Sequence, residues 1–464
     1  MTQDPQLVLK KYFDYDTFRP GQLEIVKPAL AGKDVLGILP TGAGKSVCFQ
    51  VPGLCLGPTI VVCPLIALMQ DQVERLQRYG VRATAWHSQV EEAEVEKLCE
   101  RWKLGGLDFL YVAPERLKSA KFVEIVHARA PALIVIDEAH CISAWGHEFR
   151  PSYRLIGEWL KSLSKRPVVL ALTATATPQV IKDIESSLSL HLPVKIRQTA
   201  ARKNLWLTAV SCESTQLQRI LCLRAIFRHP GKTGIIYHLT REGTIQTKEW
   251  LRSWGVSCEA YHGGMSPAER VGAQTKFMNG EVSVMAATNA FGMGIDKSNI
   301  RFVIHIGYPA NIENYWQEAG RAGRDGELSW CYLLAGKVEF GMHQQRALSQ
   351  SKGARQKVVL EQLKNMDHFG KSKNCLAQEI QNYFGERGGN KCGRCDRCCK
   401  PLLLPSSEEL KRFQGCRKKV GDGFPDSVLD WLAVVPSSEV IQLQAIPGLG
   451  FGRMKKMGEV GGLG

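Results

Sequence analysis

The sequence contains no long apolar run. Its first residues, MTQDPQLVLKKYFDYD, lack the apolar core of a secretion signal, and no apolar stretch approaches the roughly 20 residues that a membrane-spanning helix needs. Fixed-period repeats and low-complexity tracts are absent as well. These absences argue against a membrane-embedded, a secreted or a repeat protein. We therefore expect a protein of the cytoplasm or the nucleus.

Acidic residues are the scarcer class of charged residue. The 464 residues include 45 Asp and Glu against 60 Lys and Arg, which gives a formal net charge of +15. This excess favours a polyanionic partner, most simply nucleic acid, although an indifferent basic surface would have the same composition. With 44% hydrophobic and 23% charged residues, the composition is that of a globular protein. The length predicts about three domains.

The fifteen cysteines lack the spacing of a small disulfide-rich secreted domain. Most of them stand singly inside apolar runs, as Cys63, Cys141, Cys222 and Cys258 do. Reduced cysteines in such positions behave as small core residues. We therefore expect a reducing compartment.

The segment Leu39–Ser46, LPTGAGKS, has the pattern of a phosphate-binding loop except for its first glycine, which is leucine here. It follows the apolar run Val35–Ile38, which predicts a short buried strand, and helix-compatible residues follow it. A strand, a glycine turn and a helix N-terminus direct backbone N–H groups at an anion. We expect ATP here, with Lys45 on its phosphates and the Ser46 hydroxyl on Mg²⁺; an ordinary glycine-rich turn is the alternative. The predicted contacts are Thr41, Gly42, Gly44, Lys45 and Ser46.

Upstream of this loop, FRPGQ at Phe18–Gln22 offers contacts for a nucleotide base. The Gln22 amide has both a donor and an acceptor, as recognition of adenine requires. Arg19 can stack on the same base. Ordinary surface positions are the alternative for both residues.

Two series of aliphatic runs, separated by helical segments, predict two α/β lobes whose parallel sheets are covered on both faces. The runs of the first series end at LPTGAGKS, PLIALMQDQV, APERL, DEAH and TATAT. Those of the second end at HLTR, HGGM, ATNAFGMGIDK and a helical stretch containing QEAGRAGRDG, without a phosphate-binding loop. Ligands of parallel sheets bind at the carboxyl ends of strands, where the motifs of the first series fall. We place the first lobe at 1–199, the second at 200–338, a helical cysteine-containing subdomain at 339–402 and a short basic tail at 403–464.

Charged residues in both series have the character of a phosphoryl-transfer site. Asp137 follows an aliphatic run, where a carboxylate can hold Mg²⁺, and Glu138 beside it can orient or deprotonate the attacking water. Arg321 and Arg324, three residues apart, share one face if their segment is helical. A guanidinium on the γ-phosphate is worth roughly 10³ to 10⁵ in kcat. A solvated basic helix end is the alternative for these arginines.

FRPGQ, LPTGAGKS, DEAH, TATAT, ATNAFGMGIDK and QEAGRAGRDG, in this order, resemble the RecQ family of superfamily 2 DNA helicases over residues 10–400. The leucine at position 39 agrees with superfamily 2, whose members commonly lack that glycine. CISAWGHEFRPSY, residues 141–153, resembles the family's aromatic-rich loop, which couples single-stranded DNA to ATP hydrolysis. Stacking on such aromatics is worth roughly 1–3 kcal/mol per base, and core packing is the alternative. The DNA contacts implied are Trp145, His147, Phe149 and Arg150.

The resemblance implies that the two α/β lobes are RecA-like P-loop NTPase lobes. It also implies an ATP-dependent helicase that moves 3′ to 5′ on single-stranded DNA and unwinds forked duplexes in recombination and repair. It implies ATP, Mg²⁺ and Zn²⁺ as cofactors and a location at the bacterial nucleoid or in a nucleus; we expect a monomer. One alternative is a DNA-stimulated translocase or annealing factor that separates strands weakly. Another is a non-enzymatic, zinc-stabilised DNA-binding protein, which the intact Lys45, Asp137, Glu138 and Arg324 oppose. The aromatic-rich loop and the cysteines argue against an RNA helicase.

Cys392, Cys395 and Cys398 have the spacing of metal ligands in a reduced chain. The residues alone leave the fourth ligand open, because Cys399 directly follows the triplet. The resemblance favours Cys375, since the RecQ zinc-binding subdomain has this arrangement and also contains NYFGE, found here at 382–386. A closed four-cysteine site would be structural. Leu376 and the following alanine stand where the family usually has basic residues, which puts a local DNA contact in doubt.

The segment after Cys399 is too short for the winged helix and the small helical domain that many RecQ helicases carry. Residues 426–458 vaguely resemble the last helices of that small domain. IPGLG, Ile446–Gly450, suits a hairpin whose backbone N–H groups grip phosphate. A truncated tail without a role of its own is the alternative.

Overall fold

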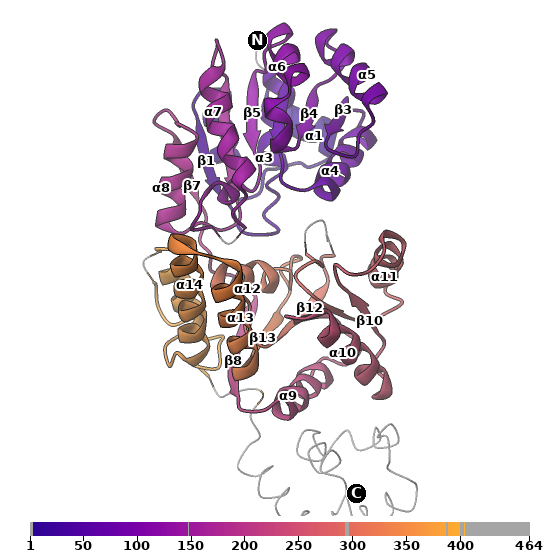
Figure 1. Ribbon diagram of the computed structural model, residues 1–464, viewed down its shortest axis with the longest axis vertical. Helices are drawn as coiled ribbons and strands as arrows, with labels where there is room; N and C mark the ends of the chain where they lie inside the picture. Colours follow the sequence, from indigo (N-terminus) through magenta and orange to yellow (C-terminus); the bar gives the residue numbers. More distant parts are fainter. Residues whose placement is uncertain (1–2, 147, 293–296, 387, 400–402, 404–464) are drawn as a thin grey trace, which may run out of the picture. The chain divides into compact units, whose positions relative to one another are not determined.

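The computed structural model describes residues 3–146, 148–292, 297–386, 388–399 and 403 (Figure 1). The described chain forms two compact units. Lobe 1 contains the described residues up to Ala201 together with the segment Ile380–Gly388. Lobe 2 contains the other described residues. Predictions for His147, for residues 293–296 of ATNAFGMGIDK and for the tail beyond Leu403 lie outside the described residues.

Lobe 1 is built on a seven-stranded sheet of order β3-β4-β2-β5-β6-β1-β7, whose paired strands are parallel. Strand β1 precedes LPTGAGKS, β5 precedes DEAH, and β6 lies between them. Their carboxyl ends meet at one edge of the sheet, so this edge carries the phosphate-binding loop, DEAH and TATAT. The strands are β1 (Val35–Ile38), β2 (Thr59–Val62), β3 (Ala83–Trp86), β4 (Phe109–Val112), β5 (Leu133–Ile136), β6 (Val168–Thr173) and β7 (Val194–Arg197).

Each face of this sheet has its own hydrophobic core. In β5, Leu133 and Val135 pack with helices α1 to α4, whereas Ile134 and Ile136 pack with α5 to α8. Side chains alternate between faces along a strand, so a strand covered on both faces must be apolar throughout. The helices are α1 (Pro5–Phe13), α2 (Gln22–Leu30), α3 (Val47–Leu56), α4 (Ile66–Arg78), α5 (Glu92–Lys103), α6 (Ala120–Ala128), α7 (Arg154–Ser162) and α8 (Pro178–Ser187), with 3₁₀ turns η1 (Pro114–Lys118), η2 (Ala139–Ile142) and η3 (Pro151–Tyr153).

Lobe 2 has a six-stranded sheet of order β10-β11-β9-β12-β13-β8, again with parallel pairs. Ile236, Phe302 and Ile304 pack from this sheet into a core that also contains Cys222 of α9 and Leu251 of α10. The strands are β8 (Leu205–Cys212), β9 (Thr233–His238), β10 (Cys258–Tyr261), β11 (Val284–Ala287), β12 (Ile300–Ile306) and β13 (Ser329–Gly336). The helices are α9 (Thr215–Phe227), α10 (Arg241–Ser253), α11 (Pro267–Asn279), α12 (Ile312–Ala319), α13 (Lys337–Gln350), α14 (Gly353–Lys371) and α15 (Leu376–Tyr383).

The cysteine-rich loop extends the lobe 2 sheet at its edge. Cys395 forms a parallel β-bridge with Leu207 of the edge strand β8. The Leu207 N–H donates to the Arg394 carbonyl (3.1 Å), and the Asp396 N–H donates to the Leu207 carbonyl (3.1 Å). The Ala209 N–H donates to the Asp396 carboxylate at 3.0 Å. The loop thus pairs backbone groups that an open sheet edge would leave to water or to another chain.

The segment Ile380–Gly388 folds with lobe 1, although it follows lobe 2 in the sequence. The Arg197 guanidinium donates to the Phe384 carbonyl. Glu386 accepts hydrogen bonds from the Ala200 N–H and the Thr199 hydroxyl, both at 2.7 Å. These contacts hold the NYFGE sequence to the last residues of lobe 1.

The predicted fold class is confirmed: two RecA-like lobes with parallel sheets, and a helical region with a cysteine cluster. The sequence analysis assigned no strand at β3, β7, β8 or β13. The sequence analysis placed Arg321 and Arg324 on one face only if their segment is helical. The segment is not helical, because α12 ends at Ala319 and both arginines lie in the turns that follow. None of the helices in the described part of the chain combines the length and the apolar character needed to cross a bilayer.

Candidate nucleotide, DNA and zinc sites

The loop between β1 and α3 is shaped by its two glycines and by one buried glutamine. Gly42 and Gly44 have φ angles of 86° and 77°, a region that glycine adopts without the strain of a side chain. The Gln22 side chain is 3% exposed, and its Nε2 donates to the carbonyls of Ala43 and Gly44, both at 3.0 Å. A Cβ atom on Gly44 would lie 2.6 Å from that nitrogen. Gln22 therefore holds the loop through its backbone carbonyls, and only glycine fits at position 44 beside the Gln22 amide.

Arg19 also contacts the backbone of this loop. Its Nη1 donates to the Gly42 carbonyl at 3.0 Å, and its backbone N–H donates to Gln22 Oε1 at 2.8 Å. In this structure the side chains of Arg19 and Gln22 thus contact the loop backbone. Thr41 and Lys45 belong to the same loop, so the predicted nucleotide contacts are together.

The Ser46 hydroxyl has a partner that the sequence analysis missed. Gln72 Nε2 donates to Ser46 Oγ at 2.7 Å, and Gln72 Oε1 accepts a hydrogen bond from Gln50 at 3.0 Å. Gln72 lies in PLIALMQDQV after β2, a motif that we noted only for its place at a strand end. A glutamine 26 residues from its partner gives no local signal in the sequence.

Asp137 and Glu138 lie buried at the carboxyl end of β5, with exposed fractions of 6% and 9%. The Asp137 N–H donates to the Val62 carbonyl (2.9 Å), and the Tyr153 hydroxyl donates to the Asp137 carbonyl (3.0 Å). Glu138 has a φ of 47°, and its N–H donates to Asp137 Oδ1 at 3.0 Å. A non-glycine residue in this region costs about 1–3 kcal/mol and persists where its surroundings impose it, often at functional sites.

The electrostatics of this carboxylate pair call for a cation. Burial and the adjacent Glu138 raise the pKa of Asp137, whereas the nearby Lys45 opposes the rise. A lone buried carboxylate pair is unfavourable, and a positive charge beside it removes that penalty. Lys45 supplies part of this charge from the phosphate-binding loop. The carboxylates and the Ser46 hydroxyl are oxygen ligands of the type that Mg²⁺ prefers.

The loop after DEAH exposes one large aromatic side chain. Trp145 is 43% exposed, and the next residue must be glycine, because a Cβ on Gly146 would lie 2.3 Å from the His140 carbonyl. Arg150 donates from Nη1 to the Pro64 carbonyl at 2.8 Å, so its guanidinium fixes the loop to the end of β2.

The second predicted aromatic, Phe149, has a different environment. The Arg154 guanidinium lies over its ring, 5.1 Å from the centroid. Phe149 and Arg154 therefore form a cation–π pair beside the loop. Of the predicted DNA contacts that the structure describes, Trp145 offers the most exposed aromatic surface for stacking.

The turn that carries Arg321 and Arg324 is held by residues that the sequence analysis missed. Arg202 donates to the carbonyls of Gly320 (3.3 Å), Ala322 (3.2 Å) and Gly323 (2.9 Å). Asn204 Nδ2 donates to the Gly323 carbonyl at 2.8 Å. Both residues come from the start of lobe 2, over a hundred positions earlier. In the sequence they lie close to the predicted boundary between the lobes, and nothing near them indicates these partners.

Arg321 and Arg324 differ in their surroundings. Arg321 is 5% exposed and donates to the carbonyl of Gly292, where a Cβ would lie 2.7 Å from the guanidinium. Arg321 thus links the turn to the ATNAFGMGIDK segment. Arg324 is partly buried. This difference makes Arg324 the better candidate for contact with a phosphate.

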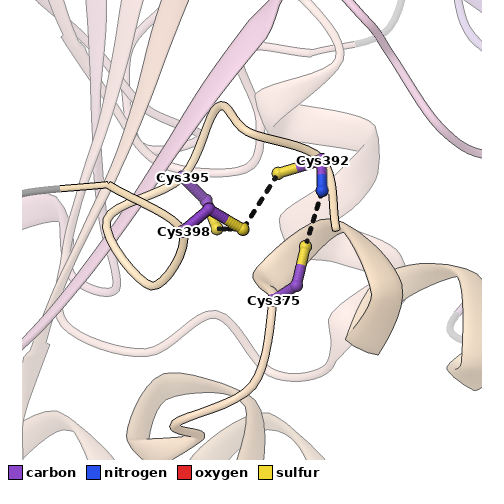
Figure 2. A group of neighbouring side chains, drawn as sticks. All are labelled: Cys375, Cys392, Cys395 and Cys398. Carbon is purple, nitrogen blue, oxygen red and sulfur yellow. Dashed lines mark hydrogen bonds between the residues drawn. The ribbon is translucent and has the colours of Figure 1, made fainter. Parts of the chain in front are cut away.

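Four thiols converge beside the edge of the lobe 2 sheet (Figure 2). The sulfur atoms of Cys375, Cys392, Cys395 and Cys398 lie within 4.8 Å of one another. Two separations are 3.9 Å for Cys392 to Cys398 and 3.5 Å for Cys395 to Cys398. Tetrahedral Zn²⁺ with Zn–S bonds near 2.3 Å places its sulfur ligands about 3.8 Å apart. The cluster therefore fits Zn²⁺ in a closed, structural site.

The chemistry of Cys375 also suits a metal ligand. Burial opposes the thiolate, but the backbone N–H groups of Cys392 and Gln378 favour it, and the pKa of Cys375 falls to about 7. The Cys392 N–H donates to Cys375 Sγ at 3.3 Å. Cys399 lies outside the group: it is exposed, and its thiol contacts the Gly393 carbonyl at 3.2 Å.

Three family profiles match consecutive parts of the chain. A DEAD/DEAH box helicase profile matches residues 19–184, a helicase conserved C-terminal domain profile matches 215–326, and a RecQ zinc-binding profile matches 337–399. Solved structures share the fold. A Mycobacterium smegmatis helicase, Lhr bound to ssDNA and AMP-PNP, gives a TM-score of 0.56 at 18% identity over 74% of this chain and 50% of its own. S. cerevisiae Dbp5 bound to RNA and ADP BeF3 gives a TM-score of 0.56 at 14% identity over 78% of this chain and 98% of its own.

Curated relatives are more similar in sequence. ATP-dependent DNA helicase RecQ of Bacillus subtilis is 41% identical over 401 residues, which cover 86% of this chain and 67% of the relative. The protein of the same name from Pasteurella multocida is 38% identical, over 85% of this chain and 62% of the relative. ATP-dependent DNA helicase Q5 of Rattus norvegicus is 38% identical over 90% of this chain and 46% of its own length. This chain belongs to the RecQ family of ATP-dependent DNA helicases.

Proposed function

We propose that this chain is a DNA-stimulated ATPase that moves 3′ to 5′ along single-stranded DNA and unwinds forked duplexes in recombination and repair. One observation carries the proposal: in lobe 1 the phosphate-binding loop, the buried carboxylate pair and the aromatic loop are joined at one edge of a sheet. The names of the relatives support this assignment, and this chain spans 46 to 67% of their length. The proposal includes action as a monomer.

Each part of the lobe 1 site has a role in this proposal. Backbone N–H groups of Gly42 and Gly44 and the Lys45 ammonium bind the phosphates of ATP. Ser46 and Asp137 hold Mg²⁺, which would neutralise charge on the phosphates. Glu138 orients or deprotonates the attacking water. For Ser46 to take this role, Gln72 must release or share the hydroxyl that it now contacts at 2.7 Å.

DNA would act on this site through the chain itself. Trp145 lies seven residues after Glu138, and the Arg150 N–H donates to the Cys141 carbonyl at 2.9 Å, so the loop folds back onto DEAH. A base that stacks on Trp145 would shift the backbone that also positions Glu138. From lobe 2, Arg324 would supply positive charge to the transition state. Single-stranded DNA would therefore raise the rate of hydrolysis.

The test compares three activities of the purified chain. ATP hydrolysis is measured with and without single-stranded DNA, and strand separation is measured on duplexes with a 3′ tail, a 5′ tail or a fork. We expect stimulation by DNA and unwinding of the forked and 3′-tailed duplexes. Stimulated hydrolysis without strand separation would identify the translocase or annealing factor instead. Absence of hydrolysis would indicate a non-enzymatic DNA-binding protein, and preference for a 5′ tail would overturn the polarity.

A further inference from the structure

We propose a second metal site, in lobe 1, that takes Zn²⁺ or a similar divalent cation through His140, Cys141 and Glu148. One ligand atom from each of these residues lies within 4.8 Å of the others. The group includes one nitrogen, one sulfur and one oxygen, a set that favours Zn²⁺ over Mg²⁺ because Mg²⁺ prefers oxygen ligands only. It belongs to a different lobe from the four-cysteine cluster, so the two sites are separate.

The distance between the nitrogen and the sulfur of this group agrees with zinc geometry. His140 Nε2 and Cys141 Sγ are 3.8 Å apart. Zn–N and Zn–S bonds near 2.05 and 2.3 Å at a tetrahedral angle place these two atoms about 3.6 Å apart. Both side chains are buried, with exposed fractions of 1% and 0%, whereas Glu148 is partly exposed.

The other ring nitrogen of His140 has the support that a metal-binding histidine usually has. Nδ1 lies 2.9 Å from Thr173 Oγ1 and 3.3 Å from Glu138 Oε2. The Thr173 hydroxyl donates its own hydrogen to the Thr175 carbonyl at 3.0 Å, so its oxygen accepts the Nδ1 hydrogen. Ligating histidines typically donate their second N–H to an oxygen in this way, which fixes the ring and directs Nε2 at the metal.

The backbone explains how Glu148 comes to lie beside residues seven and eight positions earlier. The Gly146 N–H donates to the Ser143 carbonyl at 2.9 Å, and the Arg150 N–H donates to the Cys141 carbonyl at 2.9 Å. Gly146 packs so closely on the His140 carbonyl that a Cβ would lie 2.3 Å away. These contacts return the loop to η2, and the three ligands converge as a result.

Metal binding would fix the aromatic-rich loop, residues 141–153, in one conformation. Coordination releases the Cys141 thiol proton to solvent, because a metal binds the thiolate, and His140 Nε2 binds through its lone pair. The bound ion joins η2, which follows Glu138 directly, to the loop that carries Trp145. A ligand that favours one conformation reduces the population of the others. We therefore expect Zn²⁺ at this site to inhibit DNA-stimulated hydrolysis.

Cobalt titration tests the site without reference to activity. The full chain, already loaded with one equivalent of zinc, is titrated with Co²⁺ while absorbance of the thiolate–cobalt bond is followed. We expect a second equivalent of metal with this absorbance. Cys141→Ser should abolish it, whereas Cys99→Ser, a control thiol in the same hydrophobic core, should retain it. Glu148→Gln, at a partly exposed position, should weaken cobalt binding more than about tenfold and leaves the core intact.

Two results would overturn the site: no second equivalent in the unaltered chain, or unchanged cobalt binding in Glu148→Gln. A separate assay tests the inhibition. ATP hydrolysis of the chain with its four-cysteine site loaded is measured at a range of buffered free Zn²⁺ with Mg²⁺ constant, relative to the rate of each variant without added Zn²⁺. The unaltered chain and Cys99→Ser should lose activity at lower Zn²⁺ than Glu148→Gln. Equal inhibition of all three would show that zinc acts elsewhere.

Discussion

Lobe 1 and lobe 2 have the same architecture but different residues after their strands. Both have a parallel sheet, and helices connect most of the successive strands in the described residues. In lobe 1, β1 leads into the Gly42–Lys45 loop and β5 into a buried carboxylate pair. In lobe 2, α9 begins after Ser214, whose hydroxyl accepts the Leu217 N–H at 3.2 Å, and no glycine loop precedes it.

This difference shows where the chemistry of the fold lies. The parallel sheet provides an edge at which loops meet, and the loops decide what binds there. Lobe 1 has anionic groups and phosphate-binding N–H groups at the carboxyl ends of its strands, whereas in lobe 2 the turn with two arginines directly precedes β13 and is held by Arg202 and Asn204. The following four changes test this division of roles, from the largest expected effect to the smallest.

Arg324→Ala tests whether lobe 2 contributes to hydrolysis. We expect kcat for ATP to fall about 10³-fold with little change in the unfolding temperature, because a transition-state guanidinium acts on rate. Steady-state hydrolysis and thermal unfolding are measured together. Lys276→Ala, an exposed base on α11, is the control and should keep its rate. Normal hydrolysis in Arg324→Ala would contradict a catalytic role for Arg324 of lobe 2.

Lys45→Ala tests whether the loop after β1 of lobe 1 binds the phosphates. We expect ATP turnover to fall about 10²- to 10³-fold, since the change removes one preorganised positive group from the phosphates. Single-stranded DNA should still bind, which fluorescence anisotropy measures. Lys33→Ala, exposed just before β1, is the matched control. A wild-type rate in Lys45→Ala would refute the phosphate-binding loop.

Cys392→Ser tests whether the metal of lobe 2 is structural. We expect the chain to lose its one tightly held zinc and at least about 3 kcal/mol of its unfolding free energy, because structural zinc binding contributes directly to folding. Elemental analysis and denaturant unfolding measure the two effects. Cys399→Ser should change neither, since its sulfur lies outside the cluster. A stable, zinc-free and active Cys392→Ser chain would contradict a structural site.

Trp145→Ala tests how DNA reaches the lobe 1 site. Stacking of one base is worth roughly 1–3 kcal/mol, so the affinity for single-stranded DNA and the stimulation of hydrolysis should fall about tenfold. Hydrolysis without DNA should persist. Tyr15→Ala removes another exposed aromatic of lobe 1 and should have no effect. Equal loss of basal and stimulated hydrolysis would identify Trp145 as a packing residue.

The central strands could be predicted from sequence because they are buried on both faces. β1, β2, β4 and β5 have no exposed residue, so each appears as a continuous aliphatic run that ends in a polar motif. The strands β3, β7 and β8 are at sheet edges, where partial exposure interrupts such runs. β13 lies inside its sheet and has an apolar run, yet the sequence analysis assigned no strand there.

By itself, the sequence determined the order of the motifs, the two α/β lobes and the candidate metal cysteines, because each depends on neighbouring residues and local spacing. Only the tertiary structure decided which partners hold these residues. Gln72 on Ser46, Arg202 on the arginine turn and Thr173 on His140 come from distant parts of the chain. A single polar residue specifies no partner in the sequence, since folding alone brings its donor and acceptor into contact. The sequence likewise gives no sign that His140, Cys141 and Glu148 form a group, because they come together only when the loop that carries Glu148 folds back onto η2.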